Sequence, residues 1–201
     1  MSAESARTAE TQGDLDLARR CAGGDAGAQR QLFRDQRSRV HRTLYRILGS
    51  NADMEDLVQD VFLEVFRSLA RFRGEARLST WIARITTRVA MNYIGRRKPP
   101  AQSLDALSAE VEAAGPSAEE SALAREAAER LYRALERVEA AQRVAFALHV
   151  IEGLPLREVA EITESSLVAT KSRVWRARRE IEKRARRDPL LASFLGPPEE
   201  E

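Results

Sequence analysis

Residues 152–181, EGLPLREVAEITESSLVATKSRVWRARREI, decide the fold of the C-terminal part of the chain. Apolar residues recur with helical period in PLREVAEI and again from Leu167 onward. A short turn that contains ESS, residues 164–166, lies between the two segments. Two helices joined in this way are typical of a helix-turn-helix, whose second helix enters the major groove of DNA. Ala160 is expected where the two helices cross, because a small side chain there permits close approach.

The second helix is expected to present two different faces. An apolar stripe packs inward, formed by Leu167, Thr170, Val174, Ala177 and Ile181. The outward residues that can contact bases or phosphates are Ser166, Lys171, Ser172, Arg173, Trp175 and Arg176. Further along, Arg178, Arg179 and Lys183 belong to a repetitive cationic run that suits the phosphate backbone and makes binding sensitive to salt. A solvated amphipathic helix with no ligand is the alternative interpretation.

Charge is strongly segregated along the 201 residues, although the net charge is only +2. Residues 25–98 hold 15 Lys or Arg and 8 Asp or Glu, and residues 131–187 hold 13 and 8. Between them, residues 101–130 hold 2 basic and 7 acidic residues. Two basic blocks joined by an acidic bridge favour a polyanionic partner such as nucleic acid.

The composition and periodicity predict an all-α protein of two small helical domains. Helices are expected over residues 14–22, over residues 26–48 with Asp25 as N-cap, over residues 54–70 and over residues 80–98, with a loop at 71–79. Residues 99–120, rich in Pro, Ala, Ser and Glu, predict a flexible acidic linker. The expected division is a disordered leader at 1–13, domains at 14–98 and 121–187, and a tail at 188–201.

Several classes of protein are not favoured. No apolar run is long enough to cross a membrane, and the N-terminus lacks the layout of a signal peptide, so we expect a cytoplasmic protein without membrane insertion. Cys21 is the single cysteine, and it forms no metal-ligand spacing with His41 or His149. We therefore expect no metal, no cofactor and no catalytic residues.

Taken in order, three segments resemble one family, the bacterial extracytoplasmic-function (ECF, group 4) sigma factors of the sigma-70 family. They are NADMEDLVQDVFLEVFRSLARFRG (51–74), LSTWIARITTRVAMNYIGRRK (78–98) and residues 152–181. The first is similar to the family's D-A-E-D-L-x-Q-E-x-F, the second to its T-W-L block, and the third to its region 4 helix-turn-helix. Together these resemblances cover most of residues 14–184.

The resemblance implies a helical region 2 that binds core RNA polymerase and the −10 promoter element, and a region 4 that binds the −35 element. Such proteins are alternative sigma factors that start transcription and are not enzymes. The implied partners are the β′ coiled coil and β flap of the polymerase, promoter DNA and an anti-sigma factor. The residues implied to dock on the polymerase are Glu55, Asp56, Leu57, Gln59 and Asp60.

The resemblance also assigns residues to each promoter element. Those implied for the −10 element are Phe72, Arg73, Glu75, Leu78, Ser79, Trp81, Arg84, Arg88 and Asn92. The outward residues of the last helix, named above, are implied to contact the −35 element. Arg96, Arg97 and Lys98 are expected on phosphates, with a solvated position as the alternative. Trp81 has a core position as its alternative, and Trp175 a core or partner-contact role.

The sequence departs from the family pattern at two places. The family often has Asn where this chain has Arg88. The family's helix-turn-helix usually has Gly followed by an aliphatic residue in the turn, and this chain has Glu164 and Ser165.

Two other functions remain open from the residues alone. A self-sufficient, dimeric helix-turn-helix regulator explains residues 150–187 but gives residues 53–98 no role. A DNA-processing enzyme such as a recombinase requires a nucleophile or a carboxylate–metal site, and the acids at 53–60 have no distant partners that would form one.

Overall fold

The computed structural model describes residues 3–50, 52–96, 118–186, 188, 189 and 191, and within them every regular element is helical. In chain order the elements are α1 (Ala3–Ala22), α2 (Ala26–Leu48), α3 (Met54–Ser68), the short η1 (Leu69–Arg71), α4 (Leu78–Arg96), α5 (Ala118–Leu135), α6 (Ala140–Phe146), the π-helical η2 (Ala147–Ile151), α7 (Leu156–Ile162) and α8 (Leu167–Ala185). The all-α prediction is confirmed.

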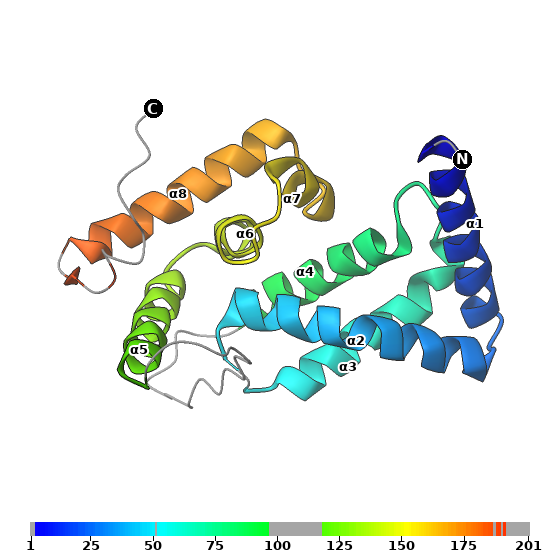
Figure 1. Cartoon of the computed structure of the whole chain (residues 1–201), viewed down its shortest axis with the longest axis horizontal. Coiled ribbons are helices and arrows are strands. Elements are labelled where there is room, and N and C mark those ends of the chain that lie inside the picture. Colours follow the sequence, from blue (N-terminus) through cyan, green and yellow to red (C-terminus); the bar gives the residue numbers. More distant parts are fainter. Residues whose placement is uncertain (1–2, 51, 97–117, 187, 190, 192–201) are drawn as a thin grey trace.

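The N-terminal bundle is built from α2, α3 and α4, with α1 packed across one end (Figure 1). Each helix buries an apolar stripe of helical period, and the stripes form a single core. Its most deeply buried members include Leu32, Leu44, Ile47, Val61, Val65 and Ile82. This bundle holds the candidate polymerase-docking and −10 residues, most of them on its outer faces, whereas Leu57 and Leu78 are buried in its core.

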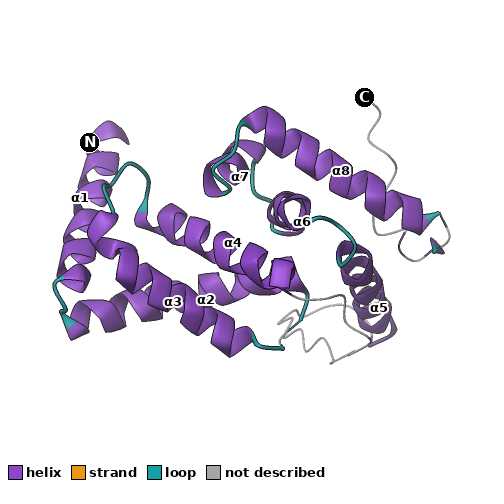
Figure 2. Ribbon diagram, turned by 180° about the vertical axis from the view of Figure 1, so that it is seen from behind, coloured by secondary structure: helices purple, strands orange, loops and turns teal. Residues whose placement is uncertain are grey.

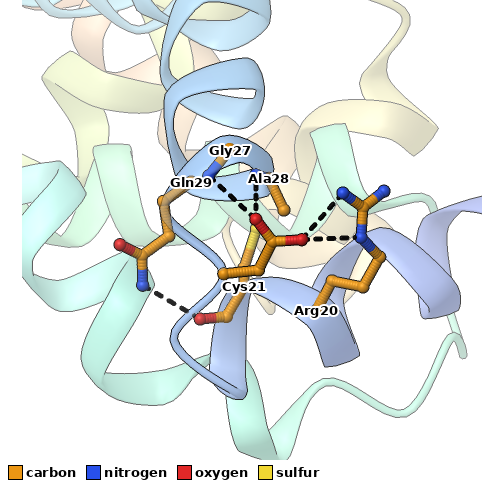
Figure 3. A network of polar contacts seen from close by, with 6 residues as sticks. Arg20, Cys21, Gly27, Ala28 and Gln29 are labelled. Atoms are coloured by element: carbon orange, nitrogen blue, oxygen red, sulfur yellow. Dashed lines mark hydrogen bonds and ion pairs between the residues drawn. The ribbon is translucent and has the colours of Figure 1, made fainter.

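The corner between α1 and α2 is fixed by the predicted N-cap, Asp25, whose partners Arg20, Gly27 and Ala28 are labelled in Figure 3. Its Oδ1 accepts hydrogen bonds from the backbone N–H of Gly27 and Ala28, at 2.8 and 3.0 Å, and its Oδ2 accepts from Arg20. The bond from Ala28, and then the one from Arg20, hold the pKa of Asp25 below its ordinary value. The Gln29 side chain donates to the carbonyl of Cys21, which completes the corner.

Helix α1 begins earlier than the sequence indicated. The expected disordered leader covered residues 1–13, but α1 already starts at Ala3. Tertiary contacts explain the difference, because Glu10 pairs with Arg77 and Asp14 Oδ2 accepts from the backbone N–H of Leu78 at 2.8 Å. Asp14 thereby satisfies an N-terminal donor of α4, a contact that local propensity cannot reveal.

The C-terminal part packs α5, α6 and α7 around α8. A second core forms there from Leu131, Leu135, Phe146, Ala177 and Ile181, all nearly fully buried. The predicted linker at 99–120 lies largely outside the described residues, and α5 begins inside it at Ala118. Among the described residues, no helix combines the length and apolarity needed to cross a bilayer.

The two parts of the chain lie against each other (Figure 2). Val144, Leu148, Val159 and Ile162 of the C-terminal part belong to the same apolar cluster as the N-terminal core. Helix α6 sits between α8 and the bundle, and both α6 and α7 contact α4.

Polar groups at the end of α2 strengthen this contact. The Tyr132 hydroxyl donates to the carbonyl of Arg46 at 3.0 Å. Gly49, which ends α2 with a φ of +69°, lies so close to the Tyr132 ring that a Cβ there would be 2.1 Å from Cγ. Only a glycine fits between the end of α2 and this ring.

Candidate polymerase and nucleic-acid interfaces

The first turns of α3 carry the predicted acidic surface. Glu55, Asp56, Gln59 and Asp60 are all exposed on one side of the helix. Leu57, which the resemblance included in docking, is only 5% exposed, so its side chain supports the helix from the core side. The acidic patch formed by the other four residues offers carboxylate and amide groups to a basic partner.

The start of α3 is held by a backbone conformation rather than by a capping side chain. Asp53 takes a φ of +57° and makes no side-chain cap bond to α3. Its Oδ2 instead accepts a hydrogen bond from the Tyr93 hydroxyl of α4 at 2.7 Å. This bond fixes the turn before α3 to α4 and so orients the acidic patch.

Sequence reasoning missed Leu63 on the same surface. This leucine is 44% exposed, and it follows Gln59 and Asp60 by one helical turn. The spacing of four and three residues from these two side chains was the available signal. Leu63 extends the acidic patch with an apolar contact surface.

The loop before α4 brings some of the predicted −10 residues together. The rings of Phe72 and Trp81 meet edge-on with centroids 5.6 Å apart, and both are partly buried against the core. Leu78 is 3% exposed and belongs to the core. Arg73 and Glu75 are exposed and lie 3.9 Å apart, while Ser79 is partly exposed. Trp81 therefore fills the core position that was its alternative, with part of its surface still open.

Farther along α4, two predicted −10 residues face the C-terminal part of the chain. Arg84 donates to the backbone carbonyl of Glu161 at 3.2 Å and pairs with its carboxylate at 3.4 Å. Arg88 pairs with Glu164 at 3.1 Å. Asn92 and Arg96 are exposed, and Arg97 and Lys98 lie outside the described residues.

Helices α7 and α8 form the predicted helix-turn-helix. Ala160 is 8% exposed at the crossing, as expected. The turn contains Glu164 at a φ of +49°, and the backbone N–H of Ser165 donates to the Ala160 carbonyl at 2.9 Å. Glu164 thus occupies the left-handed position for which glycine is normally used.

Side chains complete the turn and start α8. The hydroxyls of Thr163, Ser165 and Thr170 form a chain with spacings of 2.9 and 2.8 Å. Ser166 is the N-cap, because its Oγ accepts from the backbone N–H of Ala169 at 3.1 Å. The N-terminus of a helix such as α8 favours an anion, so this end of the helix is suited to a phosphate.

The outward face of α8 carries most of the predicted −35 residues. Lys171, Trp175 and Arg176 are exposed, and Ser172 and Arg173 are partly exposed. The inward stripe is confirmed, since Thr170, Ala177 and Ile181 are buried and Val174 packs against the core.

Trp175 lies at the surface rather than in the core. Its side chain is 50% exposed, and the guanidinium of Arg179 lies 5.0 Å from its ring centroid. Of the predicted phosphate contacts, Lys183 is exposed, and Arg178 is 3.5 Å from Glu182. Val168, which was not among the predicted DNA contacts, is 78% exposed in the first turn of α8.

The sequence of the chain matches known proteins. Residues 32–99 match the family described as Sigma-70 region 2, and residues 128–181 match Sigma-70, region 4. The ECF RNA polymerase sigma-E factor of Escherichia coli K12 is 31% identical over 187 residues, which cover 89% of this chain and 96% of the relative. This chain belongs to the ECF sigma factors of the sigma-70 family. The sigma-E factor of Haemophilus influenzae is 30% identical over 91% of the chain and all of the relative.

The assignment identifies the parts of the fold. The α2–α4 bundle is region 2, the part from α5 to α8 is region 4, and the protein is an alternative sigma factor for transcription initiation. The three segments on which the resemblance was based thus belong to the family they predicted.

Two solved structures share the fold. One is described as CnrH in complex with the cytosolic domain of CnrY, with a TM-score of 0.59 and 22% identity over 87% of this chain and 98% of that one. The other is the sigma factor RpoE in complex with the anti-sigma factor NepR from Bartonella quintana. It has a TM-score of 0.52 and 19% identity over 79% of this chain and 97% of that one.

Proposed function

We propose that this sigma factor binds core RNA polymerase through α3 and brings it to promoters whose −10 element binds region 2 and whose −35 element binds region 4. The observation that carries the proposal is the construction of α8. Its inner stripe is buried, its start is capped by Ser166, and its outer face carries Lys171, Trp175 and Arg176. In this proposal the polymerase synthesises the RNA, and the sigma factor only binds the polymerase and the promoter. Both act in the cytoplasm.

Docking on the polymerase is assigned to the acidic patch. Asp56, Gln59 and Asp60 lie on one exposed face, with Leu63 next to them. Carboxylates flanking an apolar side chain suit a basic, partly apolar surface, which the resemblance identifies as the β′ coiled coil. Region 4 is proposed to contact the β flap.

The −35 element is assigned to α8 as duplex DNA. Arg176 and Arg173 can form paired hydrogen bonds to guanine, and Lys171 and Ser172 can hold phosphates or base edges. Trp175 is exposed enough to press on a sugar or a thymine methyl group. Arg179 and Lys183 continue the cationic face along the phosphate backbone.

The −10 element is assigned to the loop and α4 as unpaired DNA. Phe72 and Trp81 supply partly open aromatic surface, and Arg73, Ser79, Arg84, Arg88 and Asn92 supply polar groups around it. Leu78 is buried in the core, so its proposed role is to support the site rather than to contact DNA. Arg96, with Arg97 and Lys98 following it in sequence, is proposed to contact phosphate.

By sequence, we assign residues 14–98 to region 2, residues 99–120 to the linker, residues 121–187 to region 4 and residues 188–201 to a tail. Helix α1 adds residues 3–13 to region 2 in place of a disordered leader. An anti-sigma factor is the proposed regulator, and the two solved neighbours are described as complexes that contain such a partner or the cytosolic domain of another protein.

The test is co-elution of the purified chain with core RNA polymerase on a sizing column. The wild type is expected to co-elute, and Asp56→Ala is expected to weaken co-elution while the protein stays folded. Asp35→Ala is the matched control, because Asp35 is an exposed aspartate of α2 and is not a member of the acidic patch on α3. A folded wild type that fails to co-elute would instead favour the dimeric helix-turn-helix regulator.

A further inference from the structure

Two residues that depart from the family pattern, one in each region, are partners in the structure. Arg88 of α4 stands where the family often has Asn, and Glu164 stands in a turn that usually has Gly. Their side chains form an ion pair at 3.1 Å, each about half exposed. The two residues that differ from the family pattern are thus oppositely charged and in contact, although they lie 76 positions apart in the sequence.

The backbone of the turn gives no reason for a glutamate. Glu164 has a φ of +49°, a conformation that glycine adopts freely and that other L-residues adopt only at an energetic cost. A strained residue that persists is explained by what its side chain does. The Glu164 side chain reaches Arg88.

Glu164 is the last member of an acidic edge on α7, which we define as Glu158, Glu161 and Glu164. The members are three residues apart, so they follow one side of α7 and the turn after it. Each faces an arginine of region 2: Glu158 lies 4.0 Å from Arg39, Glu161 lies 3.4 Å from Arg84, and Glu164 pairs with Arg88.

We propose that the acidic edge of α7 is an interaction surface for the arginine side of region 2, so that region 4 competes with promoter DNA for Arg84 and Arg88. This inference rests on the proposed −10 role of these two arginines. A guanidinium that pairs with a glutamate carboxylate has part of its charge and some of its N–H donors engaged, so a DNA phosphate or base competes with the carboxylate for those donors. The carboxylates of the edge thus occupy the groups that the −10 strand would use.

The ion pairs provide selectivity, and other contacts provide the affinity between the regions. Exposed pairs of this kind contribute little net stability. The apolar contact of Val159 and Ile162, the bonds of Arg143 to the end of α2 and the Tyr132 hydrogen bond hold the regions together. Complementary charge at the rim then favours this one arrangement, and DNA, with its higher charge density, can displace it.

The test reverses charge at the edge and measures closure by small-angle X-ray scattering of the full chain. Glu161→Arg/Glu164→Arg turns attraction to repulsion and is expected to shift the equilibrium toward the open form about tenfold, with a larger radius of gyration. The added changes Arg84→Glu/Arg88→Glu should restore the compact form. The control is Glu126→Arg/Glu129→Arg, whose glutamates pair with arginines within α5.

Binding of a mixed-sequence single-stranded DNA supplies the second readout. Glu161→Gln/Glu164→Gln should bind it about tenfold more tightly than wild type by fluorescence anisotropy, and Glu126→Gln/Glu129→Gln should gain clearly less. The proposal is overturned if wild type is already extended, if the reversed chain stays compact, or if both glutamine variants gain equally. Co-elution with core polymerase is recorded separately, so a failure of the proposed function remains distinguishable.

Discussion

Arg143 of α6 donates from Nε to the carbonyl of Ile47 at 2.8 Å and from Nη2 to the carbonyl of Leu48 at 2.9 Å. A cation of region 4 thus satisfies the last carbonyls of a region 2 helix, where the helix dipole is negative. Arg143 is 6% exposed, so this contact is buried. The two regions therefore share a polar contact as well as an apolar one.

Replacing this guanidinium should loosen the closed form. Arg143→Leu leaves the two carbonyls without these donors while they remain buried, and we expect a loss of about 2–3 kcal/mol in the closed form. Urea unfolding and the radius of gyration measure the effect. Arg137→Leu is the control, because Arg137 is exposed on the turn before α6. Equal loss in both variants would contradict the role of Arg143.

Removing the Tyr45 hydroxyl should stabilise the protein, in contrast to the loss expected for Arg143→Leu. This hydroxyl is buried and has no hydrogen-bond partner among the described residues. Tyr45→Phe should therefore raise the free energy of unfolding by about 1 kcal/mol. Tyr93→Phe is the control, because it loses the bond to Asp53 and should be destabilised. A destabilised Tyr45→Phe would show that the hydroxyl is satisfied in solution.

Tyr132 should report closure through its titration. Burial, with a smaller effect of the neighbouring Tyr45, raises the pKa of Tyr132 from 10.0 to about 12. The folded chain holds this proton more tightly, so the associated stability is complete below pH 10 and is lost as the pH rises toward 12. The measurement is tyrosinate absorbance, as the difference between wild type and Tyr132→Phe.

Opening the chain should change that titration. In Glu161→Arg/Glu164→Arg, the Tyr132 hydroxyl is exposed to water, and its midpoint should fall toward 10.0, the value without burial. An unchanged midpoint in a chain that scattering shows to be open would contradict the assignment of Tyr132 to the contact between the regions.

Two cations of α8 should affect DNA binding differently. Arg176→Ala should reduce discrimination at one −35 position by about 1–3 kcal/mol, because a paired contact to a base edge is lost. Lys183→Ala should weaken binding to all sequences alike and lower the salt slope by about 1. Promoter binding by the holoenzyme at several salt concentrations separates the two. A changed sequence preference in Lys183→Ala would refute its phosphate role.

Val168 should contact a thymine methyl group in the −35 element, since it is 78% exposed in the first turn of α8. Replacing the thymine by uracil removes only that methyl, and wild-type holoenzyme should lose about 0.8 kcal/mol of binding there. Val168→Ala should lose clearly less. Uracils outside the −35 element serve as the control, and equal losses in both proteins would contradict the contact.

Periodicity predicted the helices because each one buries its own apolar stripe. The inward residues of α8, the crossing at Ala160 and the cap at Asp25 followed from local spacing and capping chemistry. The exposed acids of α3 and cations of α8 were predicted in the same way, since the apolar stripe of a single helix shows which of its sides faces solvent.

Contacts between distant segments could not be predicted. Arg143 and Ile47 are 96 residues apart, and an apolar stripe does not reveal which helix will cover it. Arg84 and Arg88 therefore appeared as free DNA contacts, whereas the structure pairs them with region 4. The extension of α1 before residue 14 has the same origin, because Glu10 pairs with Arg77, 67 residues away.

Gly49 has a consequence for the genetics of this regulator. Any side chain at this position would collide with the Tyr132 ring at 2.1 Å and would also strain a φ of +69°. A selection for alleles that raise transcription from the promoters of this sigma factor should therefore return substitutions of Gly49. A second mutation, Tyr132→Ala, would relieve the collision but not the backbone strain. Suppressor analysis can therefore separate the effect of the collision with the ring from the effect of the strained backbone at the end of α2.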